Sequence, residues 1–256
     1  MIDLEKLSFE YFPYPIGFVK DPIESGHYKQ LSESFPPLEL FKDIDPKLPG
    51  CKYSLSDVNN SDKMQKFLAA NPQWKEFYDY LNSEEFLART LAAFKANSVD
   101  LQLSSRRPRP IDHLSELKHA ILEARLPHFR TPLSVRVEFS AVTSRGGFFK
   151  PHTDHPKKII TLVFGMALAG EWNDELGGAT DVLIPKTPRD NFNYVNRQLE
   201  FEDVTLARRY PYGPNQCLAF VKTFNSLHSV QPTTGKTTEP IRKTVTVNIM
   251  GSGGVR

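Results

Sequence analysis

The sequence predicts an α+β domain in which N-terminal helices support a C-terminal β-sandwich or jelly roll. In the first half of the chain, apolar residues recur at the spacing of amphipathic helices. After Leu133 they alternate with polar residues at a period of two, as strands do. The two patterns follow one another without a β-α-β rhythm, which argues against a parallel α/β sheet. Because no linker or internal repeat is visible, we expect one domain over 1–256, with helical support in 1–130 and a jelly-roll core in 131–256.

Four segments of the first half have helical spacing. They cover residues 22–35, 61–70, 84–97 and 112–129. Ser61 and Asp112 are the expected N-caps of the second and fourth helices, because their side chains can accept from free backbone N–H groups. Asn71-Pro72 is expected to end the second helix, since proline cannot donate a helical hydrogen bond. The Arg/Pro-rich segment 106–110 is interpreted as an exposed connector.

Four strands are predicted in the second half. The first contains Val135, Val137 and Phe139, which alternate with polar residues, and the others cover 159–166, 218–221 and 244–249. Short strands separated by loops rich in Gly, Pro and Asn are typical of a sandwich or jelly roll. In the last strand, valine and isoleucine side chains face one side, and Arg242 and Thr244 share the parity of the other.

The composition excludes several classes of protein. Among 256 residues, 39% are hydrophobic and 24% are charged, which excludes a mainly disordered chain. The net charge of +2 argues against a nucleic-acid partner or an acidic membrane surface. The uncharged apolar runs 159–170 and 210–221 have 12 residues each, too few to span a bilayer, and the N-terminal residues lack the pattern of a signal peptide. Cys51 and Cys217 fit a reducing compartment as buried thiols. We therefore expect a cytoplasmic protein with no nucleic-acid and no membrane partner.

The candidate chemistry lies in His152-Thr153-Asp154. In a strand, residues i and i+2 share a face, so the imidazole of His152 and the carboxylate of Asp154 would converge. They form two of the three ligands of a 2-His-1-carboxylate triad, which leaves open positions on Fe(II). His228 could bring the third ligand. An inward Arg242 beside the hydroxyl of Thr244 would suit a carboxylate, because the guanidinium fork matches two oxygens.

Four motifs, in the same order along the chain, resemble those of Fe(II)/2-oxoglutarate dioxygenases of the prolyl 4-hydroxylase-like group. They are the segment 146–154, which begins Gly146-Gly147 and ends His152-Thr153-Asp154; Gly177-Gly178-Ala179-Thr180; the segment 225–232 around His228; and Arg242-x-Thr244. The resemblance covers about residues 133–250. It implies a double-stranded β-helix, that is, a jelly-roll catalytic core.

The resemblance also implies a ligand set and a reaction. Iron as Fe(II) would be held by His152, Asp154 and His228, and 2-oxoglutarate would chelate it. The distal carboxylate of 2-oxoglutarate would pair with Arg242, assisted by Thr244. With O2, the cosubstrate would yield succinate and CO2 while an unactivated C–H bond is hydroxylated. The implied substrate is an amino acid or peptide, with proline as a first guess, or another small molecule; ascorbate is a candidate reductant.

The sequence departs from the group's pattern and leaves alternatives open. Thr143 and Phe149 stand where the group has tyrosines, so Thr143 would make a shorter contact to 2-oxoglutarate or none. Lys243 rivals Arg242 as the anchor, although strand parity favours Arg242. His155 would point away from Asp154 by the same parity, and the remaining histidines are expected to be structural. The alternative functions are a cupin-like metal-dependent isomerase or epimerase, a saccharide hydroxylase, and an inert binding module. Asn248 argues against demethylation of nucleic acids, because the related dioxygenases that catalyse this reaction have an arginine at the corresponding position.

Overall fold

Two antiparallel sheets form the body of the protein. The computed structural model describes residues 2–106, 109–124 and 132–251. The large sheet has the order β1-β2-β10-β7-β12-β5-β4-β3 and the small one β6-β11-β8-β9. The strands are β1 (Ser8–Glu10), β2 (Ile16–Lys20), β3 (Lys42–Asp43), β4 (Lys52–Ser56), β5 (Ser134–Thr143), β6 (Phe149–His152), β7 (Lys158–Gly165), β8 (Thr180–Pro185), β9 (Val204–Tyr210), β10 (Gln216–Val221), β11 (His228–Val230) and β12 (Ile241–Met250). This mixed architecture with antiparallel sheets is consistent with a jelly-roll core.

Strand β12 lies between β5 and β7 in the middle of the large sheet. Its residues Val245, Val247 and Ile249 are fully buried in the main hydrophobic core. The intervening residues Arg242, Thr244, Thr246 and Asn248 therefore face the other side, toward the small sheet. The predicted two-faced pattern of this strand is confirmed.

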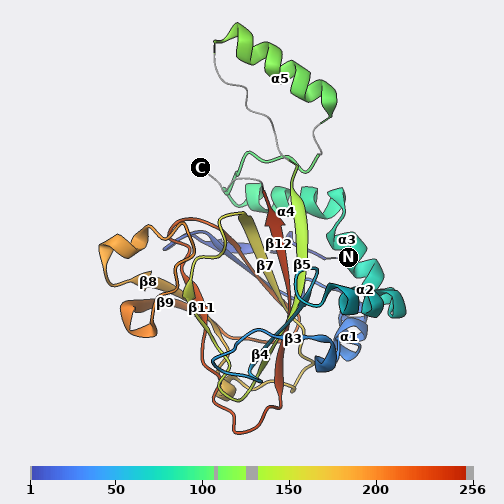
Figure 1. Cartoon of the computed structure of the whole chain (residues 1–256), viewed down its shortest axis with the longest axis vertical. Helices are drawn as coiled ribbons and strands as arrows, with labels where there is room; N and C mark the ends of the chain where they lie inside the picture. Colours follow the sequence, from blue (N-terminus) through green and yellow to red (C-terminus); the bar gives the residue numbers. More distant parts are fainter. Residues whose placement is uncertain (1, 107–108, 125–131, 252–256) are drawn as a thin grey trace.

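Four helices pack on the apolar side of the large sheet, opposite the small one (Figure 1). They are α1 (Ser25–Glu33), α2 (Ser61–Ala70), α3 (Pro72–Leu81) and α4 (Glu84–Ala96). The ring of Trp74 in α3 lies 4.9 Å from that of Phe139 in β5, in an edge-to-face arrangement. Phe67 of α2 contacts the same ring at 5.9 Å. The aromatic side chains thus join these helices to the centre of the sheet.

The first half of the chain is less purely helical than expected. Strands β1 to β4 all come from it and extend the two edges of the large sheet. Strand β2 pairs with β10, so that Phe18 lies opposite Leu218, 200 residues later in the sequence. Strand β2 has only five residues, too few to show a clear alternation of apolar and polar side chains, and the strand that it pairs with is far away in the sequence.

Helix boundaries also differ from the expectation. Pro72 does not simply end a helix: it begins α3, because the first turn of a helix needs no N–H from that position. Asn60, not Ser61, is the N-cap of α2. Arg109, not Asp112, precedes α5 (Pro110–Leu122), and the Asp112 carboxylate accepts a hydrogen bond from the Arg109 backbone N–H.

Helix α5 does not support the sheet as expected. It lies beyond α4, apart from both sheets (Figure 1). Its large apolar side chains are exposed, namely Ile111, Leu114, Leu117, Ile121 and Leu122. It was expected to reach residue 129, but 125–131 lie outside the described residues, as do 107–108 of the predicted connector. Within the described part of the chain, no helix is both long and apolar enough to span a bilayer.

Replacing Phe139 tests the junction between helices and sheet. Phe139→Ala should lower the free energy of unfolding by about 3–5 kcal/mol, because the cavity is enclosed by Phe35, Phe67 and Trp74. Urea unfolding followed by circular dichroism measures the change. Phe192→Ala is the control, since Phe192 is 76% exposed and should change stability by less than about 0.5 kcal/mol. Equal effects of the two substitutions would contradict this description of the core.

Candidate metal centre and its pocket

The three predicted metal ligands lie together. His152 ends β6 and His228 begins β11, and the two are directly paired in the small sheet, with ring centroids 4.4 Å apart. The Nε2 atom of His152 lies 3.7 Å from Oδ1 of Asp154, and Nε2 of His228 lies 3.9 Å from Oδ2. One ligand atom from each of the three residues lies within 4.8 Å of the others. This spacing allows a single ion to contact all three.

A turn, rather than strand parity, brings Asp154 to the histidines. Strand β6 ends at His152, and Asp154 has a φ of +73°. Aspartate is among the residues that tolerate this left-handed backbone. The parity argument was therefore wrong, although the convergence that it predicted is present. The expectation for His155 is met: it is exposed and is not among the three clustered ligands, and its Nδ1 accepts from the Lys157 backbone N–H at 3.1 Å.

Hydrogen bonds fix both histidines in the form that binds metals. Nδ1 lies 2.8 Å from the Lys150 carbonyl oxygen in His152 and 2.9 Å from the Ser226 carbonyl oxygen in His228. Because a carbonyl oxygen only accepts, each Nδ1 must carry the proton, and each Nε2 lone pair is free for a metal. Burial lowers the pKa of His228 to about 3 and also lowers the pKa of His152. Both rings are therefore neutral near pH 7.

Two side chains hold the carboxylate of Asp154. Burial is the largest single influence and raises the pKa of Asp154, but the ammonium of Lys158, 2.6 Å from Oδ1, and the two imidazoles together hold this pKa below the usual range. The hydroxyl of Thr161 donates to Oδ2 at 3.1 Å and also lies 3.1 Å from Oδ1 of Asn248. Two neutral imidazoles and one ionised carboxylate are the donor set of a facial triad, so the residues present fit Fe(II) with open coordination positions.

An inner pocket of about 140 Å³ extends from the triad between the two sheets. Arg242 and Thr244 line it, and Arg242 is only 4% exposed. The Nε–H of Arg242 donates to the Gly178 carbonyl oxygen at 2.7 Å, and its guanidinium carbon lies 4.6 Å from the centre of the Tyr212 ring. No carboxylate among the described residues pairs with it. Burial lowers its pKa to about 10, so it stays cationic and available to an anion.

The glycine pair at 177–178 makes this arrangement possible. Both residues have positive φ, near +75°. A Cβ on Gly177 would lie 2.4 Å from the Pro232 carbonyl oxygen, and one on Gly178 would lie 3.2 Å from Cδ of Arg242. Larger residues would therefore disturb the loop whose carbonyl oxygen accepts from Arg242.

Two of the other residues considered from the sequence, Lys243 and Thr143, lie outside the inner pocket. Lys243 projects from the opposite face of β12, with Nζ 3.1 Å from the carboxylate of Glu171. Thr143 does not line the pocket; its hydroxyl lies 3.3 Å from the Gly50 carbonyl oxygen. Phe149, the second position where the group has tyrosine, does line it.

Sequence reasoning missed three residues that support the ligands. Lys158 and Thr161 bind the carboxylate of Asp154, as described above. Lys222 is 4% exposed, and its ammonium donates to the Thr153 hydroxyl at 3.0 Å and to the Thr223 carbonyl oxygen at 3.0 Å. The available signal was a lysine that directly follows the apolar strand 217–221, where a charge is unexpected.

The depressed histidine pKa values predict a pH-dependent stability for the metal-free protein. The unfolded chain binds protons on His152 and His228 near pH 6.5, whereas the folded protein does not. Stability is therefore fully present above pH 6.5 and falls toward pH 4, by up to about 1.4 kcal/mol per pH unit for each histidine. In chelator-treated protein, His228→Asn should reduce the slope of the unfolding free energy against pH. The reduction should correspond to roughly one proton fewer taken up on unfolding. Urea unfolding at several pH values measures it, and an unchanged slope would contradict the assignment.

Solved structures with a similar fold exist, although comparisons of the sequence alone find no match. No family model and no curated protein matches the sequence. Among solved structures, IDO from Bacillus thuringiensis aligns with a TM-score of 0.51 and 14% identity, covering 93% of this chain and 90% of that one. A prolyl hydroxylase from Trichoplax adhaerens, in complex with a peptide of hypoxia inducible factor, has a TM-score of 0.48 and 10% identity over 92% and 83%. HygX from Streptomyces hygroscopicus, with nickel and 2-oxoglutarate bound, aligns with a TM-score of 0.47 and 12% sequence identity, covering 93% of this chain and 83% of that one. At these identities, the likeness to IDO shows a shared fold.

Proposed function

We propose that this chain is an Fe(II)- and 2-oxoglutarate-dependent dioxygenase that hydroxylates an unactivated C–H bond. The proposed substrate is an amino acid, a peptidyl residue such as proline, or another small molecule. One observation carries the proposal: the three candidate metal ligands and Arg242 line the same pocket. Arg242 is a buried cation that lacks a carboxylate partner among the described residues. A buried unpaired charge is costly, so a bound anion would stabilise this pocket.

His152, Asp154 and His228 would hold the iron, through the two Nε2 atoms and the carboxylate. Bound there, Fe(II) supplies the activation of O2. One oxygen atom of O2 enters the substrate as its hydroxyl group and the other enters succinate. The two further electrons come from 2-oxoglutarate, which loses the carboxyl group next to its keto group as CO2. Ascorbate is the proposed reductant when iron is oxidised without substrate.

The residues of the chain position the reactants. Arg242 would pair with the distal carboxylate of 2-oxoglutarate while its Nε–H remains bound to the Gly178 carbonyl oxygen. Thr244, which is 2% exposed on the same face of β12, would donate its hydroxyl to that carboxylate. Lys158 and Thr161 keep the carboxylate of Asp154 oriented toward the two histidines. Arg242 and Thr244, at 4% and 2% exposed, are shielded from solvent by the surrounding chain.

The anion site distinguishes this function from the alternatives. A cupin-like isomerase or epimerase that does not use 2-oxoglutarate needs a metal but no buried arginine in the same pocket. Arg242 and Thr244 therefore favour the dioxygenase. Succinate formation tests it: protein purified without oxygen is supplied with Fe(II), 2-oxoglutarate and O2, with and without candidate substrates. Failure to bind and consume 2-oxoglutarate would overturn the proposal.

Three substitutions separate the proposed roles. His152→Ala should abolish iron binding and succinate formation. Arg242→Ala should mainly raise the KM for 2-oxoglutarate, by about 30-fold or more, which corresponds to a loss of about 2 kcal/mol. Lys243→Ala is the matched control, because Lys243 pairs with Glu171 on the other face of the strand. Steady-state assays with varied 2-oxoglutarate measure these effects. A large KM effect from Lys243→Ala and none from Arg242→Ala would show that the anchor is misassigned.

A further inference from the structure

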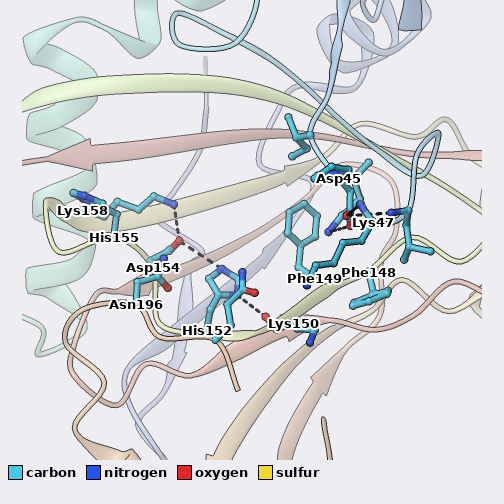
Figure 2. Close-up of a pocket in the computed structure, with 15 residues that line it drawn as sticks. Asp45, Lys47, Phe148, Phe149, Lys150, His152, Asp154, His155, Lys158 and Asn196 are labelled. Atoms are coloured by element: carbon cyan, nitrogen blue, oxygen red, sulfur yellow. Dashed lines mark hydrogen bonds and ion pairs between the residues drawn. The ribbon is translucent and has the colours of Figure 1, made fainter. Parts of the chain in front are cut away.

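A second, outer cavity of about 470 Å³ opens beside the triad. It shares His152, Asp154, Lys158 and Phe149 with the inner pocket. Figure 2 shows Asp154, His155 and Lys158 at one end of it and Asp45, Lys47 and Phe148 at the other, with His152 between. Its size lies in the range of small-molecule sites. A molecule bound here would reach the metal ligands while the inner pocket stays available to 2-oxoglutarate.

The lining of the outer cavity carries an excess of positive charge. Four lysines line it, against two aspartates: Lys47, Lys52, Lys150 and Lys158, and Asp45 and Asp154. Since the net charge of the whole chain is only +2, this excess is concentrated at the cavity. An excess of positive charge in a cavity attracts anionic ligands.

Two of the four lysines are already neutralised by carboxylates. Lys52 lies 2.5 Å from the carboxylate of Asp45, and both side chains are largely buried. Its ammonium also lies 5.3 Å and 5.1 Å from the ring centres of Phe148 and Phe149. Lys150 pairs with Glu200 at the rim. Because each of these two lysines is paired with a carboxylate, neither contributes net positive charge for a ligand.

The other two lysines differ from each other in their pairing. Lys47 forms no ion pair with any described residue. Lys158 pairs with Asp154, whose charge would be shared with a metal ion held by the triad. The lining of the cavity also includes the apolar side chains of Ile44, Leu48 and Phe149. The combination suits a molecule with an apolar carbon skeleton and an anionic group.

We propose, building on the dioxygenase function, that the outer cavity binds the primary substrate as a carboxylate with an apolar carbon skeleton. The carboxylate pairs with Lys47 at the far end, the skeleton lies along Phe149, and Lys158 adds positive potential near the metal ligands. The carboxylate can belong to a free organic or amino acid or to the C-terminus of a peptide. This places a C–H bond of the skeleton, rather than the acid group, beside His152.

Matched acids and amides test the charge preference. The probes are straight- and branched-chain carboxylic acids of four to eight carbons, each with its primary amide, and N-acetyl-leucine with its amide as a peptide-like pair. Binding to the anaerobic protein with Fe(II) and saturating 2-oxoglutarate is followed by ligand-observed NMR. At least one acid should bind about tenfold more tightly than its amide. Equal affinities in every pair, or no binding by any acid, would overturn the proposal.

Substitutions at Lys47 test the assigned partner without touching the metal ligands. Lys47→Met should weaken binding of the preferred acid by about three- to tenfold and leave its amide unaffected, as expected for a partly exposed ion pair. Lys47→Arg should retain the preference. Lys157→Met is the matched control, because Lys157 is exposed and does not line the cavity. An acid preference that survives Lys47→Met, or inorganic phosphate that competes as strongly as the acid, would contradict the assignment.

The two proposals fail in different ways. Acid-selective binding that depends on Lys47, without any succinate formation, would overturn the dioxygenase function and leave the anion site. Succinate formation stimulated only by neutral substrates would overturn the anion site and leave the dioxygenase function. Comparing N-acetyl-leucine with the free acids tells whether the cavity accepts a peptide terminus or a free acid alone.

Discussion

The structure depends on the two-faced character of β12, which lies at the centre of the large sheet. On one face, Val245, Val247 and Ile249 join the core that the helices cover. On the other, Arg242 and Thr244 line the inner pocket. Because side chains alternate along a strand, a slip of one residue would exchange the two sets and bury the polar ones in the core. Long pairing with β5 and β7 fixes the register, and the same strand thereby stabilises the fold and positions the proposed anion site.

Much of the fold could be predicted where the pattern is long and local. Helix α4 and strand β12 are long enough for their periods to be clear. Strands β1 to β4 were missed because they are short and are stabilised by partners far away in the sequence, as β2 is by β10. Helix α3 was missed because Pro72 has opposite meanings inside a helix and at its first position. The exposed apolar face of α5 shows the limit of periodicity, which predicts a helix but not what it packs against.

The candidate site was predictable in its chemistry but not in its supporting contacts. His152, Asp154 and His228 could be identified from residue type and motif order, and the structure brings them together. The reason given for Asp154 was wrong, because a positive φ rather than strand parity turns it toward the histidines. Lys158 and Lys222 were not foreseen, since a lysine next to a strand is usually solvated and only the folded chain shows which oxygens it contacts. The charge of the outer cavity likewise arises from segments far apart in the sequence.

The central claim is that the triad and Arg242 form one site, in which metal and 2-oxoglutarate bind together. Equilibrium dialysis of labelled 2-oxoglutarate under anaerobic conditions, with and without Fe(II), tests it most directly. Fe(II) should tighten 2-oxoglutarate binding by at least about tenfold, because the metal and the guanidinium would hold opposite ends of the same molecule. Equal binding with and without Fe(II), or no binding in either case, would contradict it.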